Sequence, residues 1–202
     1  TSFGFRGEEH GVQKAGNTTW LVDPIDGTNH FVRGLPFCTT MIALIENGEV
    51  VLSIIHDFVR QDTYWAIKGQ GAYKNNEKLR VSHRTLPQSL LSFETRLNKP
   101  VNLEAHLRLS QAAGGLISTI NCGFEFSMIA SGKLDGRITL DPYGQDWDYA
   151  PGSLLVTEAG GIISNHRMQG YDYQNHNFVA TNQIIHAALT QGNEAIFPDI
   201  SS

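Results

Sequence analysis

Apolar residues in the first half of the chain alternate with polar ones, or form short blocks, in the way that β-strands do. The block Thr19–Val22 precedes Asp23-Pro24, and a residue before proline favours extended backbone, so we expect a strand that ends there. Asn47-Gly48 lies between two β-branched blocks and predicts a hairpin. We expect an antiparallel sheet with a turn at 69–71 and strands at 37–45, 49–56, 63–67 and 79–81.

The second half alternates helical and extended patterns. Leu154 and Leu155 indicate a helix over 148–159 that ends at Gly160-Gly161, and leucines at 103, 107 and 109 indicate one over 102–113. A third helix is expected at 124–130, and a fourth follows Asn182 as its N-cap. The expected strands are 116–120, 162–163 and 178–180. The pattern predicts a layered α/β fold, a single domain with approximate halves 1–100 and 101–202.

Composition narrows the possible partners. The chain has 202 residues, 41% hydrophobic and 17% charged, which is typical of a folded protein. Its net charge of −5 disfavours nucleic acid as a partner. Its longest apolar runs are far below the roughly 20 residues of a membrane span, and no signal core begins the sequence. With two cysteines and no CxxC pair, we expect a cytoplasmic protein without disulfides.

The segment Asp23-Pro24-Ile25-Asp26-Gly27-Thr28 is the first candidate for chemistry. Two carboxylates follow an apolar strand, and Gly27 allows a sharp turn, so both carboxylates and the Ile25 carbonyl can converge. Such an all-oxygen set suits Mg²⁺, and the amide groups at a following short helix, 29–32, would attract phosphate. The alternative is an ordinary Asx turn, with Thr28 as the helix cap.

Two further acidic motifs have a structural and a functional interpretation. Gly7-Glu8-Glu9 is either a solvated surface pair or part of a cation site. Asp148 is either the cap of a helix that holds Pro151 in its first turn, or a third cation ligand. The sequence lacks GxxxxGK[ST] and GxSxG motifs, so nucleotide-driven phosphoryl transfer and serine hydrolysis lack their usual elements.

Three blocks in this order resemble the inositol monophosphatase family, which contains Mg²⁺-dependent, lithium-sensitive phosphomonoesterases. They are residues 7–9, residues 20–31 (WLVDPIDGTNHF), and residues 147–150 (WDYA) leading to 157–161 (TEAGG). The resemblance implies a layered α-β-α-β-α sandwich. It also implies two helices before the acidic pair that have no counterpart in this sequence, so we expect the sandwich without them.

The resemblance assigns roles residue by residue. Glu8 would bridge metal ions and, with Thr28, hold the attacking water, and the amides of Gly27 and Thr28 would bind phosphate. The implied metal ligands are Glu8, Asp23, the Ile25 carbonyl, Asp26 and Asp148, and the implied substrate contacts are Asp141 and Cys122.

The implied function is hydrolysis of a small polyol or sugar phosphate monoester, with myo-inositol 1-phosphate as the first choice. Two or three Mg²⁺ ions would activate a water for in-line attack, and the resemblance also implies a homodimer. One alternative is a related metal phosphatase acting on fructose 1,6-bisphosphate, histidinol phosphate or a 3′-phosphonucleotide. Another is a non-catalytic module that binds cations or polyphosphate.

Overall fold

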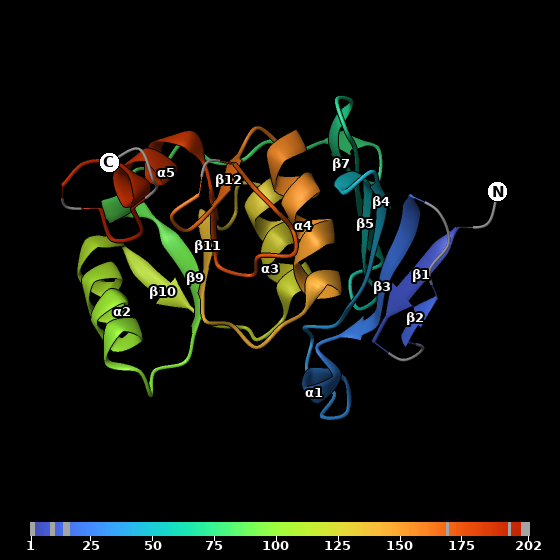
Figure 1. Cartoon of the computed structure of the whole chain (residues 1–202), viewed down its shortest axis with the longest axis horizontal. Coiled ribbons are helices and arrows are strands. Elements are labelled where there is room, and N and C mark those ends of the chain that lie inside the picture. The colour runs from blue at the N-terminus through green and yellow to red at the C-terminus, as the bar shows by residue number, and fades with distance from the viewer. Residues whose placement is uncertain (1–2, 9–10, 14–16, 169, 194, 199–202) are drawn as a thin grey trace.

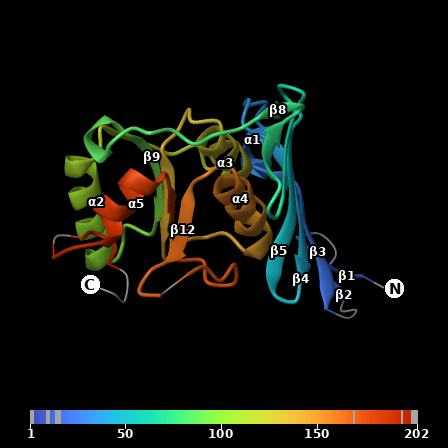
Figure 2. The same cartoon turned by 90° about the horizontal axis from the view of Figure 1, so that it is seen from above.

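Two β-sheets stand face to face with a pair of helices between them, and two more helices cover the far side of one sheet (Figures 1 and 2). The computed structural model describes residues 3–8, 11–13, 17–168, 170–193 and 195–198. The layered α/β prediction is confirmed, and four layers are present in the order sheet, helices, sheet, helices. Within these ranges the longest helices have 13 residues, and none combines the length and the apolar character needed to cross a bilayer.

The larger sheet has the strand order β2-β1-β3-β4-β5-β6-β7-β8. Only the β1–β3 pairing is parallel within it. Asn47 and Gly48 both have positive φ angles, 51° and 85°, and join β4 to β5 in the predicted hairpin. The strands are β1 (Gly4–Gly7), β2 (Gly11–Gln13), β3 (Thr18–Asp26), β4 (Thr39–Glu46), β5 (Glu49–Asp57), β6 (Asp62–Ile67), β7 (Gly71–Lys74) and β8 (Glu77–Lys78).

Two strand predictions for this sheet were wrong. β3 continues past Asp23-Pro24 to Asp26, because its register against β4 shifts between Asp23 and Asp26 and this irregularity accommodates the proline. Residues 79–81 are not a strand. Leu79 and Val81 are buried on either side of an exposed residue, which imitates strand alternation, but they belong to an irregular segment that packs into the central core.

The smaller sheet has the order β10-β9-β11-β13-β12 and carries helices on both faces. Its outer face packs against α2 and α5 through Leu91, Leu109, Ile138 and Ile185, all completely buried. The elements are β9 (Leu90–Thr95), α2 (Pro100–Ala112), β10 (Gly115–Ile117), β11 (Gly136–Leu140), β12 (Ile162–Asn165), β13 (Phe178–Thr181) and α5 (Gln183–Thr190). A short 3-10 helix, η1 (Leu86–Gln88), precedes β9.

Helices α3 (Cys122–Ala130) and α4 (Asp146–Glu158) fill the space between the sheets. Most of their residues are buried, so neither helix shows a clear polar face. Both begin two residues earlier than predicted, and Pro151 lies in the interior of α4 rather than in its first turn. Packing on both faces outweighs the lost backbone hydrogen bond of the proline, and Ser53 Oγ donates to the Pro151 carbonyl at 2.5 Å.

Candidate active site

The end of β3 places Asp26 against the first residues of α3. The Asp26 carboxylate accepts hydrogen bonds from Gly123 N at 2.6 Å, Thr39 Oγ1 at 2.9 Å and Cys122 N at 3.3 Å. Amide groups in the first turn of a helix have no partner within the helix, and here they orient a carboxylate. Asp26, which is 5% exposed, therefore has a fixed direction toward the space between the sheets.

The turn after Asp26 requires glycine and depends on Asn121. Gly27 has φ 86°, and a Cβ there would lie 2.5 Å from Asn121 Nδ2 and 2.6 Å from the Phe37 carbonyl oxygen. Asn121 Nδ2 donates to the Asp26 carbonyl at 2.8 Å, while its Oδ1 accepts from Phe124 N and caps α3. Asn121 has no role among the predicted site residues, although an Asn directly before a helix is a recognisable cap signal.

Thr28 is the first residue of α1 (Thr28–Phe31) and does not cap it, contrary to the expectation of a cap before a helix at 29–32. Its hydroxyl instead donates to the Ile25 carbonyl at 3.0 Å. A hydroxyl has one hydrogen and two lone pairs, so Thr28 Oγ1 can still accept a hydrogen bond from a donor that enters the site. The Ile25 carbonyl, a predicted metal ligand, keeps one lone pair.

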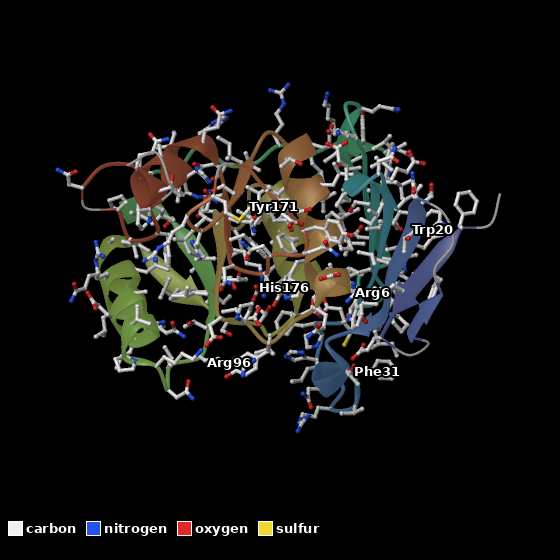
Figure 3. The ribbon with its side chains drawn as sticks, in the orientation of Figure 1. Arg6, Trp20, Phe31, Arg96, Tyr171 and His176 are labelled. Carbon is white, nitrogen blue, oxygen red and sulfur yellow. The ribbon has the colours of Figure 1, made fainter. Side chains whose placement is uncertain are left out.

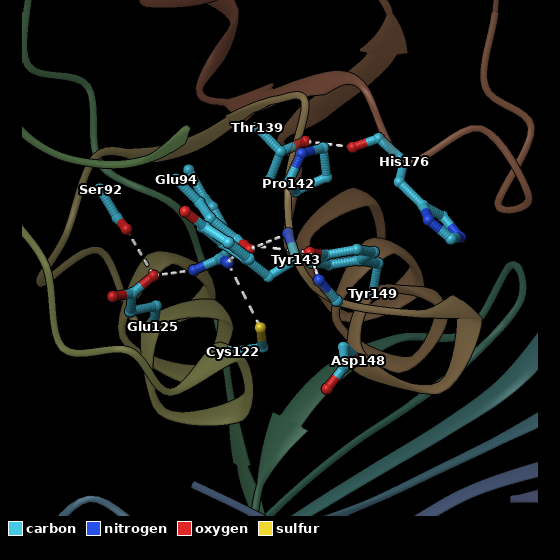
Figure 4. A network of polar contacts seen from close by, with 12 residues as sticks. Ser92, Glu94, Cys122, Glu125, Thr139, Pro142, Tyr143, Asp148, Tyr149 and His176 are labelled. Carbon is cyan, nitrogen blue, oxygen red and sulfur yellow. Dashed lines mark hydrogen bonds and ion pairs between the residues drawn. The ribbon is translucent and has the colours of Figure 1, made fainter. Parts of the chain in front are cut away.

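Asp148 approaches the same place from α4. It is the third residue of this helix, and its carboxylate accepts from Gln145 N at 2.5 Å. Asp26, Cys122 and Asp148 each offer a ligand atom, and these atoms lie within 4.8 Å of one another. Figure 4 shows Asp148 and Cys122 on neighbouring helices, and both residues line the same cavity. The structure thus gathers groups from β3, α3 and α4.

The clustered carboxylates raise one another's pKa. Burial and the nearby Asp26 and Asp148 charges raise the pKa of Asp23 to about 8. Burial also raises the pKa of Asp26 to about 7, and burial with the nearby Glu94 charge raises that of Asp148 to about 6. A divalent cation would relieve this repulsion, and carboxylate oxygens are the donors that Mg²⁺ prefers. The residues therefore fit a Mg²⁺ centre.

Glu8 follows β1 and lies at the rim of the site. It is exposed, it lines the cavity beside Asp26, and its charge contributes to the raised pKa of Asp23 and Asp148. Glu9, the second member of the predicted acidic pair, lies outside the described residues. The position of Glu8 is compatible with the bridging role that the sequence predicts, which stays a prediction.

A cavity of about 610 Å³ opens between the carboxylates of Glu8, Asp26 and Asp148 on one side and the smaller sheet on the other. Its lining includes Gly27, Thr28 and Cys122, which are predicted site residues. The opposite side of the cavity is polar and is built mainly from β9, α3 and β11. Of these three elements the sequence predicts only the helix, so this side of the cavity was not predicted. The cavity-lining residues on that side that form one hydrogen-bonded network are Ser92, Glu94, Glu125, Arg137 and Tyr143 (Figure 4).

Asp141 lies beyond the end of β11 and forms ion pairs outside the cavity. Lys99 Nζ lies 2.6 Å from one of its carboxylate oxygens and Arg96 Nε lies 3.9 Å from the other. Among the described residues that line the cavity, Asp141 does not occur. Its predicted contact with substrate hydroxyls stays a prediction, without support from this arrangement.

Asp146 holds the start of α4 in place. Its carboxylate pairs with Arg6 Nη1 at 2.5 Å and with His176 Nε2 at 2.7 Å, and it is almost completely buried. Figure 3 shows that Arg6 and His176 approach this end of α4 from different parts of the chain. These contacts position Asp148 two residues later. Neither partner is near Asp146 in sequence, so the pairing could not be predicted.

Residues 2–196 match the model of the inositol monophosphatase family, which is 195 of 202 positions. The chain belongs to the inositol monophosphatase family. The DPIDGT and WD motifs, which carry the resemblance in the sequence, meet in space through Asp26 and Asp148.

Several relatives within the inositol monophosphatase family are similar to this chain. The fructose-1,6-bisphosphatase/inositol-1-monophosphatase of Thermotoga maritima is 31% identical, over 88% of this chain and 68% of that protein. The Nus factor SuhB of Xylella fastidiosa is 32% identical, over 80% of this chain and 60% of that protein. The solved inositol monophosphatase structure from Anabaena superposes with a TM-score of 0.83 and 26% identity, over 91% of this chain and 75% of that one. The chain thus spans about three fifths to two thirds of these curated relatives.

Proposed function

We propose that this protein hydrolyses the phosphate monoester of a small polyol or sugar in a Mg²⁺-dependent reaction, and that myo-inositol 1-phosphate is a substrate. The convergence of Asp26 and Asp148 on one cavity carries this proposal, together with Asp23, which does not line the cavity but is close enough for both charges to raise its pKa. Family membership supports the reaction class.

The residues that would hold two or three Mg²⁺ ions are Glu8, Asp23, the Ile25 carbonyl, Asp26 and Asp148. When bound, the ions would neutralise the phosphate and lower the pKa of a water molecule. The protein contributes a fixed geometry, because Asp26 is held by Gly123 N and Thr39 Oγ1, and Asp148 by Gln145 N. Fixed ligands avoid reorganisation during the reaction.

The amides of Gly27 and Thr28 would bind the phosphate. Within the described part of the chain neither N–H has a hydrogen-bond acceptor, and both residues line the cavity. They lie directly after Asp26, so a phosphate held there would touch the metal ligands. Unpaired amide groups of this kind are common phosphate contacts.

Thr28 and Glu8 would orient the attacking water. The Thr28 hydroxyl already donates to the Ile25 carbonyl, so toward water it acts as an acceptor, as does the Glu8 carboxylate. A water that donates both of its hydrogens to these two groups directs a lone pair elsewhere, which favours in-line attack on phosphorus. No phosphorylated protein side chain is required.

Phosphate release from myo-inositol 1-phosphate tests the proposal. Protein treated with EDTA is expected to be inactive, to recover activity on titration with Mg²⁺, and to be inhibited by Li⁺. A folded protein that releases no phosphate from this or other polyol monoesters at any Mg²⁺ concentration would contradict the proposal, and would favour a cation-binding module. We also propose that the protein is a homodimer and is located in the cytoplasm. Sedimentation tests the first and cell fractionation the second.

A further inference from the structure

The cavity wall beside the metal-binding carboxylates carries three charged side chains. Glu94 comes from β9 and Glu125 from α3, as Figure 4 shows. Arg137 comes from β11, and all three residues line the cavity. Arg137 pairs with both glutamates. Two carboxylates share one guanidinium, so the wall keeps one net negative charge.

This negative charge is presented by Glu94 rather than by Glu125. The Glu125 side chain is 1% exposed and accepts hydrogen bonds from Ser92, Thr119 and Arg137. Arg137 is 3% exposed, and its two terminal nitrogens are directed at the glutamates and at Cys122 Sγ. Glu94 is 20% exposed. A bound substrate would therefore meet the Glu94 carboxylate.

The Glu94 carboxylate is rigidly held and still has hydrogen-bonding capacity. Its Oε2 accepts from Tyr149 Oη at 3.0 Å and from Arg137. Among the residues that the structure describes, Oε1 accepts only from Tyr143 N, at 2.8 Å. A carboxylate oxygen has two lone-pair sites, so Oε1 can accept one more hydrogen bond. It has no proton to donate when ionised, so it cannot bind an anion.

Arg96 and Lys99 are engaged outside the cavity lining. The Arg96 guanidinium lies over the Tyr143 ring at 4.2 Å and donates to the carbonyls of Asp141 and Pro142. Lys99 pairs with Asp141. Among the described cavity-lining residues Arg137 is the single cation, and its charge is already shared.

We propose that Glu94 is a specificity-determining residue that accepts a hydrogen bond from a substrate hydroxyl and excludes substrates carrying a second phosphate. The inference rests on the proposed function, because that function places the first phosphate beside Asp26 and Asp148. It narrows the substrate class to monophosphates of neutral polyols, although one relative is named as a fructose-1,6-bisphosphatase as well. A fixed charge in a binding site rejects ligands that would place a charge of the same sign beside it.

The test compares kcat/KM for myo-inositol 1-phosphate and fructose 1,6-bisphosphate in wild type and in Glu94→Gln. Wild type should prefer the monophosphate. Glu94→Gln should reduce this preference by about tenfold, mainly through a lower KM for the bisphosphate, and less so at high salt, because one repulsive charge is removed. Tyr149→Phe is the matched control, since it removes one donor from the same carboxylate and keeps the charge, so the preference should stay unchanged.

The outcomes separate this inference from the proposed function. If wild type hydrolyses the monophosphate but Glu94→Gln, shown by circular dichroism to be folded, changes the preference less than twofold, Glu94 does not determine specificity. If folded wild type hydrolyses neither these two compounds nor other polyol monoesters, the proposed function fails. Calorimetric titration of both compounds into Mg²⁺-loaded protein then tests Glu94 through the ratio of their dissociation constants in wild type and in Glu94→Gln. If Glu94→Gln does not fold, Glu94→Asp replaces it, and must weaken monophosphate binding while still rejecting the bisphosphate.

Discussion

The Thr28 hydroxyl has a defined direction, which makes its function testable. Since it donates to the Ile25 carbonyl, it would act on water as an acceptor. Thr28→Val keeps the β-branched shape and the backbone amide but removes this acceptor. We expect turnover of myo-inositol 1-phosphate to fall by about 10²–10³-fold, typical for one positioned group, with smaller changes in KM and Mg²⁺ affinity.

Thr28→Ser is the control, because serine restores the hydroxyl. The Thr28 side chain does not cap α1, so loss of a cap should contribute little to the effect of valine. Steady-state kinetics of both variants give the answer. Equal turnover of the valine and serine variants would show that Glu8 alone orients the water.

Asp26→Asn is expected to abolish Mg²⁺-dependent hydrolysis while changing stability little. The amide supplies less negative charge to a cation, and its NH₂ group must face one of the donors that now bind Asp26. That lost hydrogen bond costs about 1 kcal/mol, and the relieved repulsion with Asp23 and Asp148 opposes it. Phosphate release and thermal unfolding are measured together. Near-normal turnover at saturating Mg²⁺ would refute the assignment of Asp26 as a ligand.

The residues that could be predicted are those that lie in contiguous motifs. Asp23, Asp26 and Asp148 stand in segments whose order and spacing identify them, and the structure places Asp26 and Asp148 together. Glu94 and Arg137 are 43 positions apart, and neither stands in a recognisable motif. Their pairing follows from the parallel register of β9 and β11, which no local pattern reveals.

At the scale of elements, close packing of α3 against α4 depends on Gly152. A Cβ at this position would lie 1.9 Å from Cδ2 of the Phe126 ring. Alanine favours a helix by about 1 kcal/mol over glycine, but we expect Gly152→Ala to lower the free energy of unfolding by about 1–3 kcal/mol because it overpacks the core. Denaturant unfolding measures this change.

A second substitution identifies the cause of that effect. Phe126→Leu makes room for the new methyl group, so the double variant should lose less stability than the two single changes added together. Additive losses would indicate that the Gly152 backbone, rather than the contact with Phe126, is responsible.

The elements that the sequence predicted were more often right in type than in their boundaries, whereas β1, β2, β9 and β11 had no predicted counterpart. The 47–48 hairpin and the helix after Asn182 form as expected, because turn residues and a capping side chain act over a few positions. The Pro151 prediction and the 79–81 strand were wrong, because burial in the central core decides the conformation there. Where a segment is packed on several sides, tertiary packing overrides the intrinsic helix or strand preference of its residues.

At the scale of the whole molecule, the acidic cluster should make stability depend on pH and on metal. The pKa of Asp23, Asp26 and Asp148 is raised to about 8, 7 and 6 in the folded state, from about 3.9 in an unfolded chain. The folded state therefore binds more protons, and this contribution to stability is complete below pH 4 and is lost as the pH rises toward 8. Without metal, ionising the cluster destabilises the fold.

We therefore expect Mg²⁺ to raise the thermal midpoint more at pH 8 than at pH 5.5, measured against protein in EDTA. Burial lowers the pKa of His166, and this group acts in the opposite direction, so the pH slope in EDTA is compared between wild type and Asp23→Asn. The variant should show a shallower loss of stability with rising pH. An equal slope, with an equal Mg²⁺ effect at both pH values, would contradict the electrostatic account of the cluster.

The hydrogen bonds from the start of α3 to Asp26 join residues 96 and 97 positions apart. Closing so long a segment has an entropic cost that is recovered only when both halves of the chain are docked. A folding intermediate with the first sheet formed but α3 undocked would lack the hydrogen bonds from Cys122 N and Gly123 N to Asp26. Tight cation binding would then arise late in folding, and the rate at which affinity for Mg²⁺ develops during refolding would report the docking of the two halves rather than the formation of either sheet.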